Sequence, residues 1–221
     1  MRISLLGGTG DIGEGLALRL AYDTHHEVVI GSRDPERARN KATEYERELD
    51  CRGVDRTVNG FVNAMAADRG DVVVLAVPPG HVEGTIEDIA DRLSEDTIVV
   101  TPAVKMRRGE TGLHYDPPAA GSVAALVRDA VPDSNPVVGA FHTLSADRLA
   151  NLDVTFDMDT LVFGDDDDAT DVVMRIAGGI EGLRPLDAGS LDSAPEVESL
   201  TPLLITIGLQ NDLHDVGVRF G

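Results

Sequence analysis

The segment from Ile3 to Gly13 reads ISLLGGTGDIG, and after a helix-forming stretch residues 27–33 read EVVIGSR. This order predicts a strand, a glycine-rich turn, a helix and a second strand. Gly8, Gly10 and Gly13 fit the pattern G-x-G-x-x-G, while Gly7, Gly10 and Gly13 fit the variant G-x-x-G-x-x-G. In this motif the first glycine allows a tight turn and the second lets the backbone approach a pyrophosphate closely. The third lets the helix pack closely on the strand.

The helix that follows this turn would offer free N–H groups and the positive end of its dipole to phosphates. Thr9, Asp11 and Ile12 lie within the turn and the first helical residues, so they belong to the same candidate site. The sequence therefore predicts dinucleotide binding. The alternative is a glycine-rich turn in an α/β domain that binds no nucleotide.

The end of the second strand indicates which dinucleotide. An NAD enzyme usually places an acidic residue about 20 residues after the turn, to bind the ribose 2′-hydroxyl. Here the strand ends in Ser32 and Arg33, with Arg37 one helical turn later. A hydroxyl and two guanidinium groups suit a 2′-phosphate, so the prediction is NADP(H). We expect Asp34 to cap the next helix ahead of Pro35, not to bind ribose.

The rest of the chain continues to alternate strands with helices, which predicts a parallel sheet with right-handed crossovers. The expected fold class is α/β, a Rossmann-type doubly wound parallel sheet with a smaller C-terminal α/β domain. Residues 103–121 look irregular, and the four aspartates 165–168 look like a solvated turn whose last member caps a helix. The further strands are expected at 54–58, 71–77, 97–100, 136–141, 160–164 and 183–187, and the further helices at 35–50, 60–68, 80–93, 122–131, 169–181 and 195–214.

Composition excludes several functions. The 221 residues carry 39 acidic and 19 basic side chains, for a net charge of −20, which opposes binding to nucleic acid or to an anionic membrane. Lys41 and Lys105 are the only lysines. Spread along the chain, this charge indicates adaptation to high salt in the cytoplasm of a halophile, an archaeon in our interpretation; the alternative is an ordinary acidic cytosolic protein. We expect neither a signal peptide nor a membrane span.

The chain offers little for a metal site or for covalent catalysis. Its one cysteine, Cys51, excludes an internal disulfide, and we expect a partly buried side chain without a catalytic role. No tyrosine has a lysine four residues later, and no nucleophile elbow, metal cluster or Ser/His/Asp set is present. A protein that holds NADP without an acid–base apparatus fits hydride exchange between two cofactors, which themselves carry the chemistry.

Ligands of open α/β sheets bind beyond the carboxyl ends of the strands. His142 lies just after a predicted strand, where a second substrate would meet a nicotinamide, and His81 follows another strand end. His25, His26 and His214 look like surface or packing residues, and His114 is unassigned. The strand-end residues that we take as further candidates for the site are Val77, Pro78, Thr101, Pro102, Ala103, Thr143 and Leu144.

The chain resembles the NADPH-dependent reductases of the deazaflavin coenzyme F420, over nearly its whole length and with a short insertion before Val28. The C-terminal segments are much more specific than the glycine motif. The segments that carry the resemblance are residues 5–10 with Gly13, Gly31–Arg33, His142–Thr143, Ala150–Asp153, Gly164–Asp167, Gly182–Gly189 and Val197–Leu203.

This resemblance implies a Rossmann domain over residues 1–144 and a small domain over 145–221, with the deazaflavin in the cleft between them. It also implies that the 2′-phosphate is held by Thr9, Ser32, Arg33 and Arg37, where arginine replaces a lysine. His142, Thr143 and Leu144 would line the deazaflavin site. Two places near the expected cleft depart from the family pattern: Pro79-Gly80 stands where an aromatic and an acidic residue are common, and Lys105-Met106 stands where a proline is common.

The expected function is reversible hydride transfer between NADP(H) and coenzyme F420, with solvent or His142 as the proton source. The alternatives are another NADP-dependent reductase, acting on an imine or carbonyl, and a non-catalytic NADP-sensing protein. We also expect a homodimer, because the last helix carries more apolar residues than a small domain need bury. These residues are Leu200, Leu203, Leu204, Ile207 and Leu209.

Overall fold

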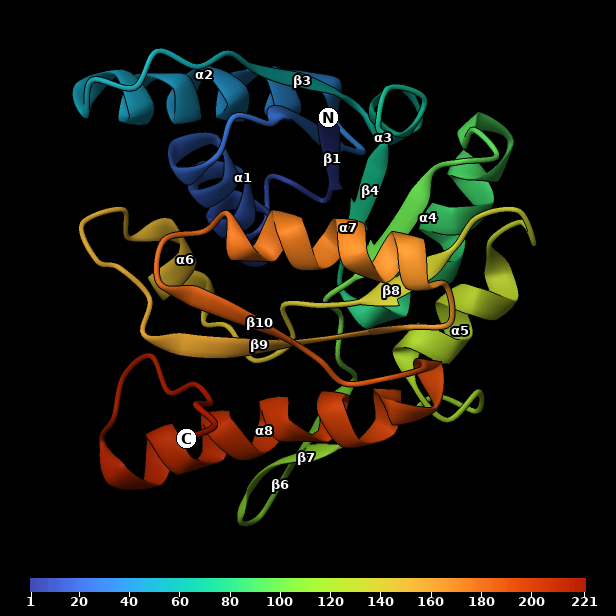
Figure 1. Cartoon of the computed structure of the whole chain (residues 1–221), viewed down its shortest axis with the longest axis vertical. Coiled ribbons are helices and arrows are strands. Elements are labelled where there is room, and N and C mark those ends of the chain that lie inside the picture. Colours follow the sequence, from blue (N-terminus) through green and yellow to red (C-terminus); the bar gives the residue numbers. More distant parts are fainter.

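The computed structural model describes residues 1–221 and contains one eight-stranded sheet with helices on both faces (Figure 1). Neighbouring strands are parallel except for β8 and β9, which are antiparallel. From β1 the strand order runs to β2 and β3 on one side and to β4 and β5 on the other, as in doubly wound folds, which confirms the expected class. Across the sheet the strands are β10 (Leu183–Asp187), β9 (Met158–Gly164), β8 (Val137–Gly139), β5 (Ile98–Thr101), β4 (Val72–Leu75), β1 (Arg2–Leu6), β2 (Glu27–Ser32) and β3 (Val58–Val62).

Helices α1, α2 and α7 contribute to a cluster of 31 buried residues on one face, and α3, α4 and α5 to a cluster of 15 on the other. The helices are α1 (Asp11–Asp23), α2 (Pro35–Cys51), α3 (Asn63–Ala67), α4 (Val82–Ile89), α5 (Val123–Ala130), α6 (Ala146–Ala150), α7 (Asp167–Gly178) and α8 (Ala194–Asn211). Short 3-10 turns cover Pro79–His81, Ala90–Arg92 and Leu191–Ser193.

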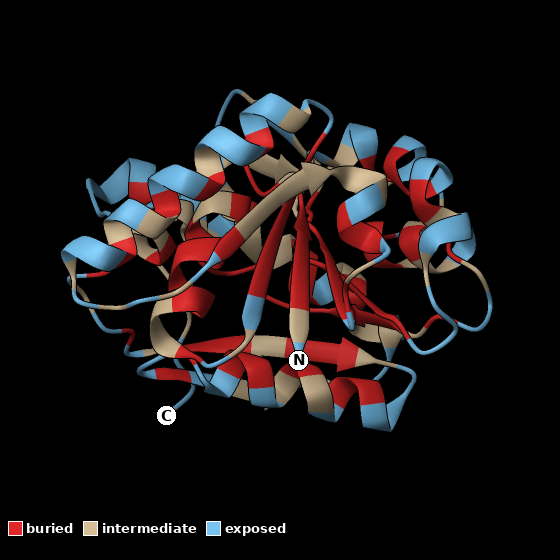
Figure 2. Ribbon diagram, turned by 90° about the horizontal axis from the view of Figure 1, so that it is seen from above, coloured by how far each residue is buried: buried red, intermediate tan, exposed pale blue.

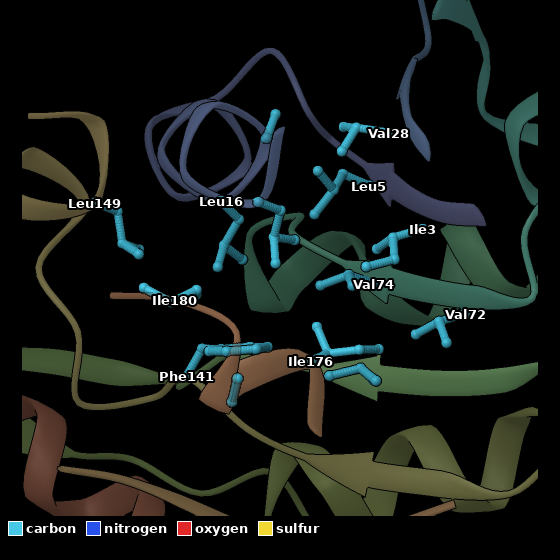
Figure 3. Packing of buried hydrophobic residues seen from close by; sticks show 14 of the residues in the cluster. Ile3, Leu5, Leu16, Val28, Val72, Val74, Phe141, Leu149, Ile176 and Ile180 are labelled. Atoms are coloured by element: carbon cyan, nitrogen blue, oxygen red, sulfur yellow. The ribbon is translucent and has the colours of Figure 1, made fainter. Parts of the chain in front are cut away.

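The central strands are buried on both faces, as the apolar runs of the sequence require (Figure 2). Side chains alternate along each strand, so Ile3 and Leu5 of β1 point to one face and Leu6 belongs to the cluster on the other. Figure 3 shows Leu16 of α1 and Ile176 of α7 converging on the first face. This packing fixes the position of α1 and therefore of the glycine-rich turn that precedes it.

The expected strand at 54–58 is displaced: β3 spans Val58–Val62. Helix α2 continues to Cys51, and the chain then turns at Gly53, which adopts the left-handed conformation with φ +76°. The following residues are used to cross back to the sheet, where Val58 pairs with Val28 of β2. The helix that we expected from residue 60 is correspondingly short, because the strand occupies its first residues.

Residues 103–121 contain regular structure that we did not expect. A hairpin is formed by β6 (Met106–Gly109) and β7 (Gly112–Tyr115), with Gly112 at φ +134°. It packs on α8, where the Thr206 hydroxyl accepts a hydrogen bond from the Leu113 N–H (3.0 Å). The sequence of these strands has no apolar pattern that would predict them. They form because contacts with the distant helix α8 stabilise them.

Beyond β8 the chain forms the segment that we expected to be a separate domain. Its strand β9 joins the large sheet through two antiparallel residue pairs with β8, and β10 pairs with β9. Helix α7 lies over these strands, and α8 lies on their other side together with the hairpin (Figure 1). The division into domains 1–144 and 145–221 stays a prediction.

Two details differ from expectation. The helix after the four aspartates is capped by Asp166, whose carboxylate accepts from the Ala169 N–H (2.8 Å), and not by Asp168. Cys51 is exposed instead of partly buried, because it ends α2 at the surface. Asp34 caps α2 as expected, accepting from the N–H groups of Glu36 and Arg37 in the first turn of the helix.

Candidate active site

The glycine-rich turn after β1 has the geometry that a phosphate site needs. Gly7 adopts φ +79°, a conformation that favours glycine. A Cβ on Gly13 would lie 2.4 Å from the Gly7 carbonyl oxygen, so only glycine lets α1 pack this closely on the turn. A Cβ on Gly10 would meet nothing nearer than 3.5 Å. Gly10 is the N-cap of α1 and supplies no side chain to its free N–H groups, which therefore remain available to an anion.

The end of β2 brings the predicted hydroxyl and guanidinium groups beside this turn. Ser32 is buried, and its hydroxyl oxygen accepts a hydrogen bond from the Asp34 N–H (3.2 Å). Arg37 donates from its guanidinium to the carbonyl oxygen of Thr9 (3.0 Å), which connects α2 to the turn. Arg33 is exposed and forms no ion pair with a carboxylate. Two cationic groups thus lie at this end of the glycine-rich turn in a strongly acidic chain.

A cavity of about 1,030 Å³ opens at the carboxyl edge of the sheet. It is large enough for a cofactor ring and part of a second ligand. The structure brings ten of the predicted residues to its wall: Gly10, Asp11, Ile12, Val77, Pro78, Pro102, Ala103, His142, Thr143 and Leu144. The predicted residues outside the wall are Gly7, Gly8, Thr9, Gly13, Ser32, Arg33, Arg37, His81 and Thr101.

His142 lies in this wall with its ring buried to 4% exposure. Burial lowers the pKa of its imidazole to about 3, so the ring is neutral at physiological pH. The ring stacks on Phe163 with 5.4 Å between centroids, and neither ring nitrogen has a hydrogen-bond partner. The Thr143 hydroxyl is likewise buried without a partner. Buried polar atoms are rarely left unpaired, so these two side chains, which both belong to lining residues, are the candidates in this part of the wall for a hydrogen bond to a ligand.

The backbone around His142 is held in a specific shape. Phe141 adopts φ +67°, which is unusual for a residue with a large side chain. Its ring is buried in the core (Figure 3), and this packing offsets the backbone strain. The carbonyl oxygen of His142 accepts a hydrogen bond from the Thr201 hydroxyl of α8 (2.7 Å). Core and helix together therefore fix the direction of the His142 side chain.

Arg19 holds the next part of the wall. Its buried guanidinium donates to the carbonyl oxygens of Arg148, Leu149 and Asn151, and pairs with Asp23 (3.7 Å). Desolvation by burial lowers its pKa. Because Arg19 belongs to α1, this contact fixes α6 against the helix that begins at the glycine-rich turn.

Sequence reasoning missed one side of the cavity. Helix α8 and the segment after it provide much of the wall, including His214, which we had assigned to the surface or to packing. No local motif marks these residues, because they reach the cavity only through the tertiary fold. The missed lining residues with polar or large apolar side chains are Met106, Ser145, Asp147, Thr201, Leu204, Ile205, Leu209, Asp212, Leu213, His214, Asp215 and Val216.

The side of the cavity formed by α8 is anchored by a buried carboxylate. Glu198 is fully buried and accepts hydrogen bonds from the Tyr115 hydroxyl (2.8 Å) and from the N–H groups of Val123 (3.0 Å) and Ala124 (2.9 Å). Burial raises the pKa of Glu198. One side chain thus joins α8, the hairpin and the N-terminus of α5. The positive end of the α5 dipole also stabilises the carboxylate there.

The charged side chains in the wall are mostly acidic. Asp11, Asp147, Asp212 and Asp215 line the cavity with His214, and no lysine or arginine is among the lining residues. The cationic groups lie instead at Arg33 and Arg37, at the far end of the glycine-rich turn. The cationic end of the turn, and not the acidic wall of the cavity, therefore suits a phosphate.

This fold and this turn define a Rossmann-type dinucleotide-binding protein, with a second ligand space beside the nucleotide site. A family model described as NADP oxidoreductase, coenzyme F420-dependent, matches residues 2–105. The F420-dependent NADP reductase of Methanocaldococcus jannaschii is 37% identical over 222 residues, covering 99% of this chain and 97% of that protein. The F420-dependent NADP reductase of Methanothermobacter marburgensis is 35% identical over 224 residues, with 99% and 97% covered. The chain belongs to the family of F420-dependent NADP reductases.

A solved structure shares the fold along the whole chain. It comes from Arthrobacter sp. FB24 and is provisionally assigned as an F420-dependent NADP reductase. Its TM-score is 0.81 at 23% identity, with 100% of this chain and 99% of that chain covered. At this identity the likeness supports the fold. None of the helices has the length and hydropathy needed to span a membrane.

Proposed function

We propose that this chain is an oxidoreductase that transfers a hydride reversibly between NADP(H) and coenzyme F420. The observation that carries the proposal is the cavity itself, which extends from the free N-terminus of α1 to His142 and Thr143. Such a space would hold a nicotinamide and a deazaflavin ring together. The two cofactors supply the hydride chemistry, and the protein contributes orientation and exclusion of water.

The nucleotide half is assigned as follows. The glycines of the turn, with Asp11 and Ile12, would approach the pyrophosphate, which the open space at Gly10 supports. Thr9, Ser32, Arg33 and Arg37 would hold the 2′-phosphate, because exposed cationic groups meet the turn there. The residues that would border the nicotinamide, at the ends of β4 and β5, are Val77, Pro78, His81, Thr101, Pro102 and Ala103.

The deazaflavin half includes His142, Thr143 and Leu144. The neutral ring of His142 would donate or accept one hydrogen bond at the polar edge of the deazaflavin. Since its pKa lies near 3, His142 holds no imidazolium proton at neutral pH, and solvent is the better assignment for the proton that accompanies reduction. No side chain in the wall is therefore assigned as an obligatory acid.

The proposal also includes an assembly and a location. Exposed apolar residues on α8 support a homodimer, and Leu203 (52% exposed) and Leu209 (67%) are the most accessible of those expected there. We place the enzyme in the cytoplasm, with small-molecule cofactors as its partners. Nucleic acid and membrane surfaces are poor partners for a chain of net charge −20.

One assay separates the proposed function from its alternatives. Purified protein is mixed with NADPH and F420 while the absorbance band of the oxidised deazaflavin is followed, and the reverse direction is followed by NADPH formation. Turnover in both directions is the expected result. Reduction of imines or carbonyls without F420 turnover would favour a different reductase, and NADPH binding without any turnover would favour an NADP sensor.

A further inference from the structure

The segment after α8 turns back and forms a wall of the cavity. All five residues from Asp212 to Val216 line it. Asp212 and Asp215 both adopt left-handed backbone conformations, with φ of 53° and 55°. Such conformations are unusual for residues other than glycine, although asparagine and aspartate adopt them more often than most other residues do. The chain is therefore bent twice within four residues, which brings it over the cavity.

Two anchors hold this segment in place. At its far end, the N–H of Asp159 donates to the Val218 carbonyl oxygen (2.8 Å), and the Asp159 carboxylate accepts from the Phe220 N–H (2.6 Å) and from Arg184. At its near end, the Ser145 hydroxyl donates to Oδ1 of Asp215 (2.9 Å). The first anchor fixes the chain terminus to β9, away from the cavity wall. The second lies within the wall.

Ser145 directly follows the segment His142–Leu144. Its hydroxyl also caps α6, accepting from the Arg148 N–H (3.4 Å), so its proton is free to be donated to Asp215. The bond therefore ties the C-terminal segment to the same short loop that carries His142. The two residues are 70 positions apart in the sequence, and both line the cavity.

We propose that Asp215 is a positioning residue, which through Ser145 fixes the C-terminal wall against the deazaflavin and so sets the affinity for that co-substrate. The inference rests on the proposed function for the identity of the ligand. Neither Ser145 nor Asp215 makes a side-chain hydrogen bond to the glycine-rich turn or to Arg33 or Arg37, which form the proposed 2′-phosphate site. Loss of the anchor should therefore raise the KM for F420 and leave the KM for NADPH nearly unchanged.

The chain offers a matched control. Asp215→Ala removes the acceptor of the Ser145 bond, one negative charge, and a side chain suited to the left-handed conformation. Asp212→Ala removes an equal charge from the same wall at nearly the same φ, but Asp212 makes no side-chain bond to Ser145. The difference between the two variants isolates the anchor. Asp215→Asn keeps an oxygen acceptor and the backbone preference, and should restore the wild-type behaviour.

Two measurements test the anchor in the full-length protein. Amide hydrogen exchange is measured without ligands, and residues 212–217 should exchange about tenfold faster in Asp215→Ala than in Asp212→Ala. Steady-state kinetics should give a KM for F420 raised about fivefold to tenfold in Asp215→Ala, with both effects reversed in Asp215→Asn.

Equal exchange in the wild type and in Asp215→Ala would overturn the inference, whatever the activity. An equal rise of KM for F420 in the Asp212 and Asp215 variants would also overturn it, since charge alone would then explain the effect. The proposed function fails separately, if the wild-type protein does not turn over F420; the exchange measurement still decides whether the anchor holds the wall.

Discussion

The guanidinium of Arg37 donates a hydrogen bond of 3.0 Å to the carbonyl oxygen of Thr9, which joins α2 to the glycine-rich turn. Arg37 is thus partly engaged in holding the turn, whereas Arg33 is exposed without an ion pair. The two arginines therefore have different roles in the proposed 2′-phosphate site. Arg33 is the group whose charge is free for the ligand.

Arg33→Ala should weaken the binding of NADPH by about tenfold or more, because a charge-assisted hydrogen bond contributes about 1.5–3 kcal/mol. NADH lacks the 2′-phosphate and should change little. Binding of both nucleotides is measured by fluorescence titration. Arg39→Ala is the matched control, since Arg39 is also an exposed arginine, lies on α2 and is not assigned to the phosphate site. Equal weakening of NADPH and NADH would show that Arg33 does not recognise the phosphate.

The glycines of the turn should separate folding from binding. Gly13→Ala should lower the free energy of unfolding by about 1–3 kcal/mol, because its Cβ would lie 2.4 Å from the Gly7 carbonyl oxygen. Gly10→Ala has room for its Cβ in the free protein and should keep the wild-type melting temperature. Its NADPH affinity should nevertheless fall by about tenfold, a change that corresponds to about 1.4 kcal/mol. Unchanged affinity for NADPH in a well-folded Gly10→Ala variant would show that the pyrophosphate does not bind next to Gly10.

These local features were predictable from the sequence because a few neighbouring residues determine them. The turn from Gly7 to Gly13 and the cap at Asp34 depend on backbone conformation and short-range hydrogen bonds. The cavity wall at α8 depends on distant partners: Glu198 reaches the N–H groups of Val123 and Ala124, about 75 residues away. Single-sequence patterns contain no record of such pairings, so the individual residues of that wall were missed, although the family resemblance placed the C-terminal segment beside the cleft.

The hairpin illustrates the same limit on a smaller scale. Arg107 and Arg108 give β6 no apolar face, and the sequence there predicts a loop. The structure forms strands because Thr206 of α8 bonds to both backbone groups of Leu113. A residue almost a hundred positions away thus determines the local conformation.

Salt should stabilise and activate the protein. The net charge of −20 is self-repelling, and four aspartates line a cavity that is to accept anionic cofactors. At about 1 M salt the Debye length falls to roughly 3 Å, which screens this repulsion. The melting temperature and the turnover rate should both rise from dilute buffer to molar KCl. Choline chloride at equal ionic strength tests whether screening suffices, and maximal stability in dilute buffer would contradict the halophilic interpretation.

The apolar residues of α8 should mediate a homodimer. Leu209 is 67% exposed, and no charged residue lies between Glu198 and Asp212, so two acidic copies can meet there with little repulsion. Light scattering in high salt should give the mass of a dimer, and Leu209→Glu should give a folded monomer. Met65→Glu, at another exposed apolar residue, should leave the dimer intact. A monomeric wild-type protein would rule out this assembly.

His142 should affect both the rate and the pH dependence of stability. His142→Ala should lower F420 turnover by about 10- to 100-fold, less than the roughly 10²–10⁴ of an obligatory general acid. The folded ring stays neutral down to a pKa of about 3, whereas in the unfolded chain it takes up a proton near pH 6.5. Its contribution therefore makes the folded state less stable as the pH falls below 6.5.

This linkage has a measurable size. Between pH 7.5 and pH 5, protonation of the unfolded ring costs the wild-type protein about 2 kcal/mol of stability that His142→Ala does not lose. Denaturant unfolding of both proteins at the two pH values should show a smaller destabilisation by the mutation at pH 5. The same destabilisation at both pH values would show that folding leaves the pKa of His142 unchanged, and would contradict this prediction. Complete loss of hydride transfer in the variant, with both cofactors still bound, would assign His142 to proton transfer instead of orientation.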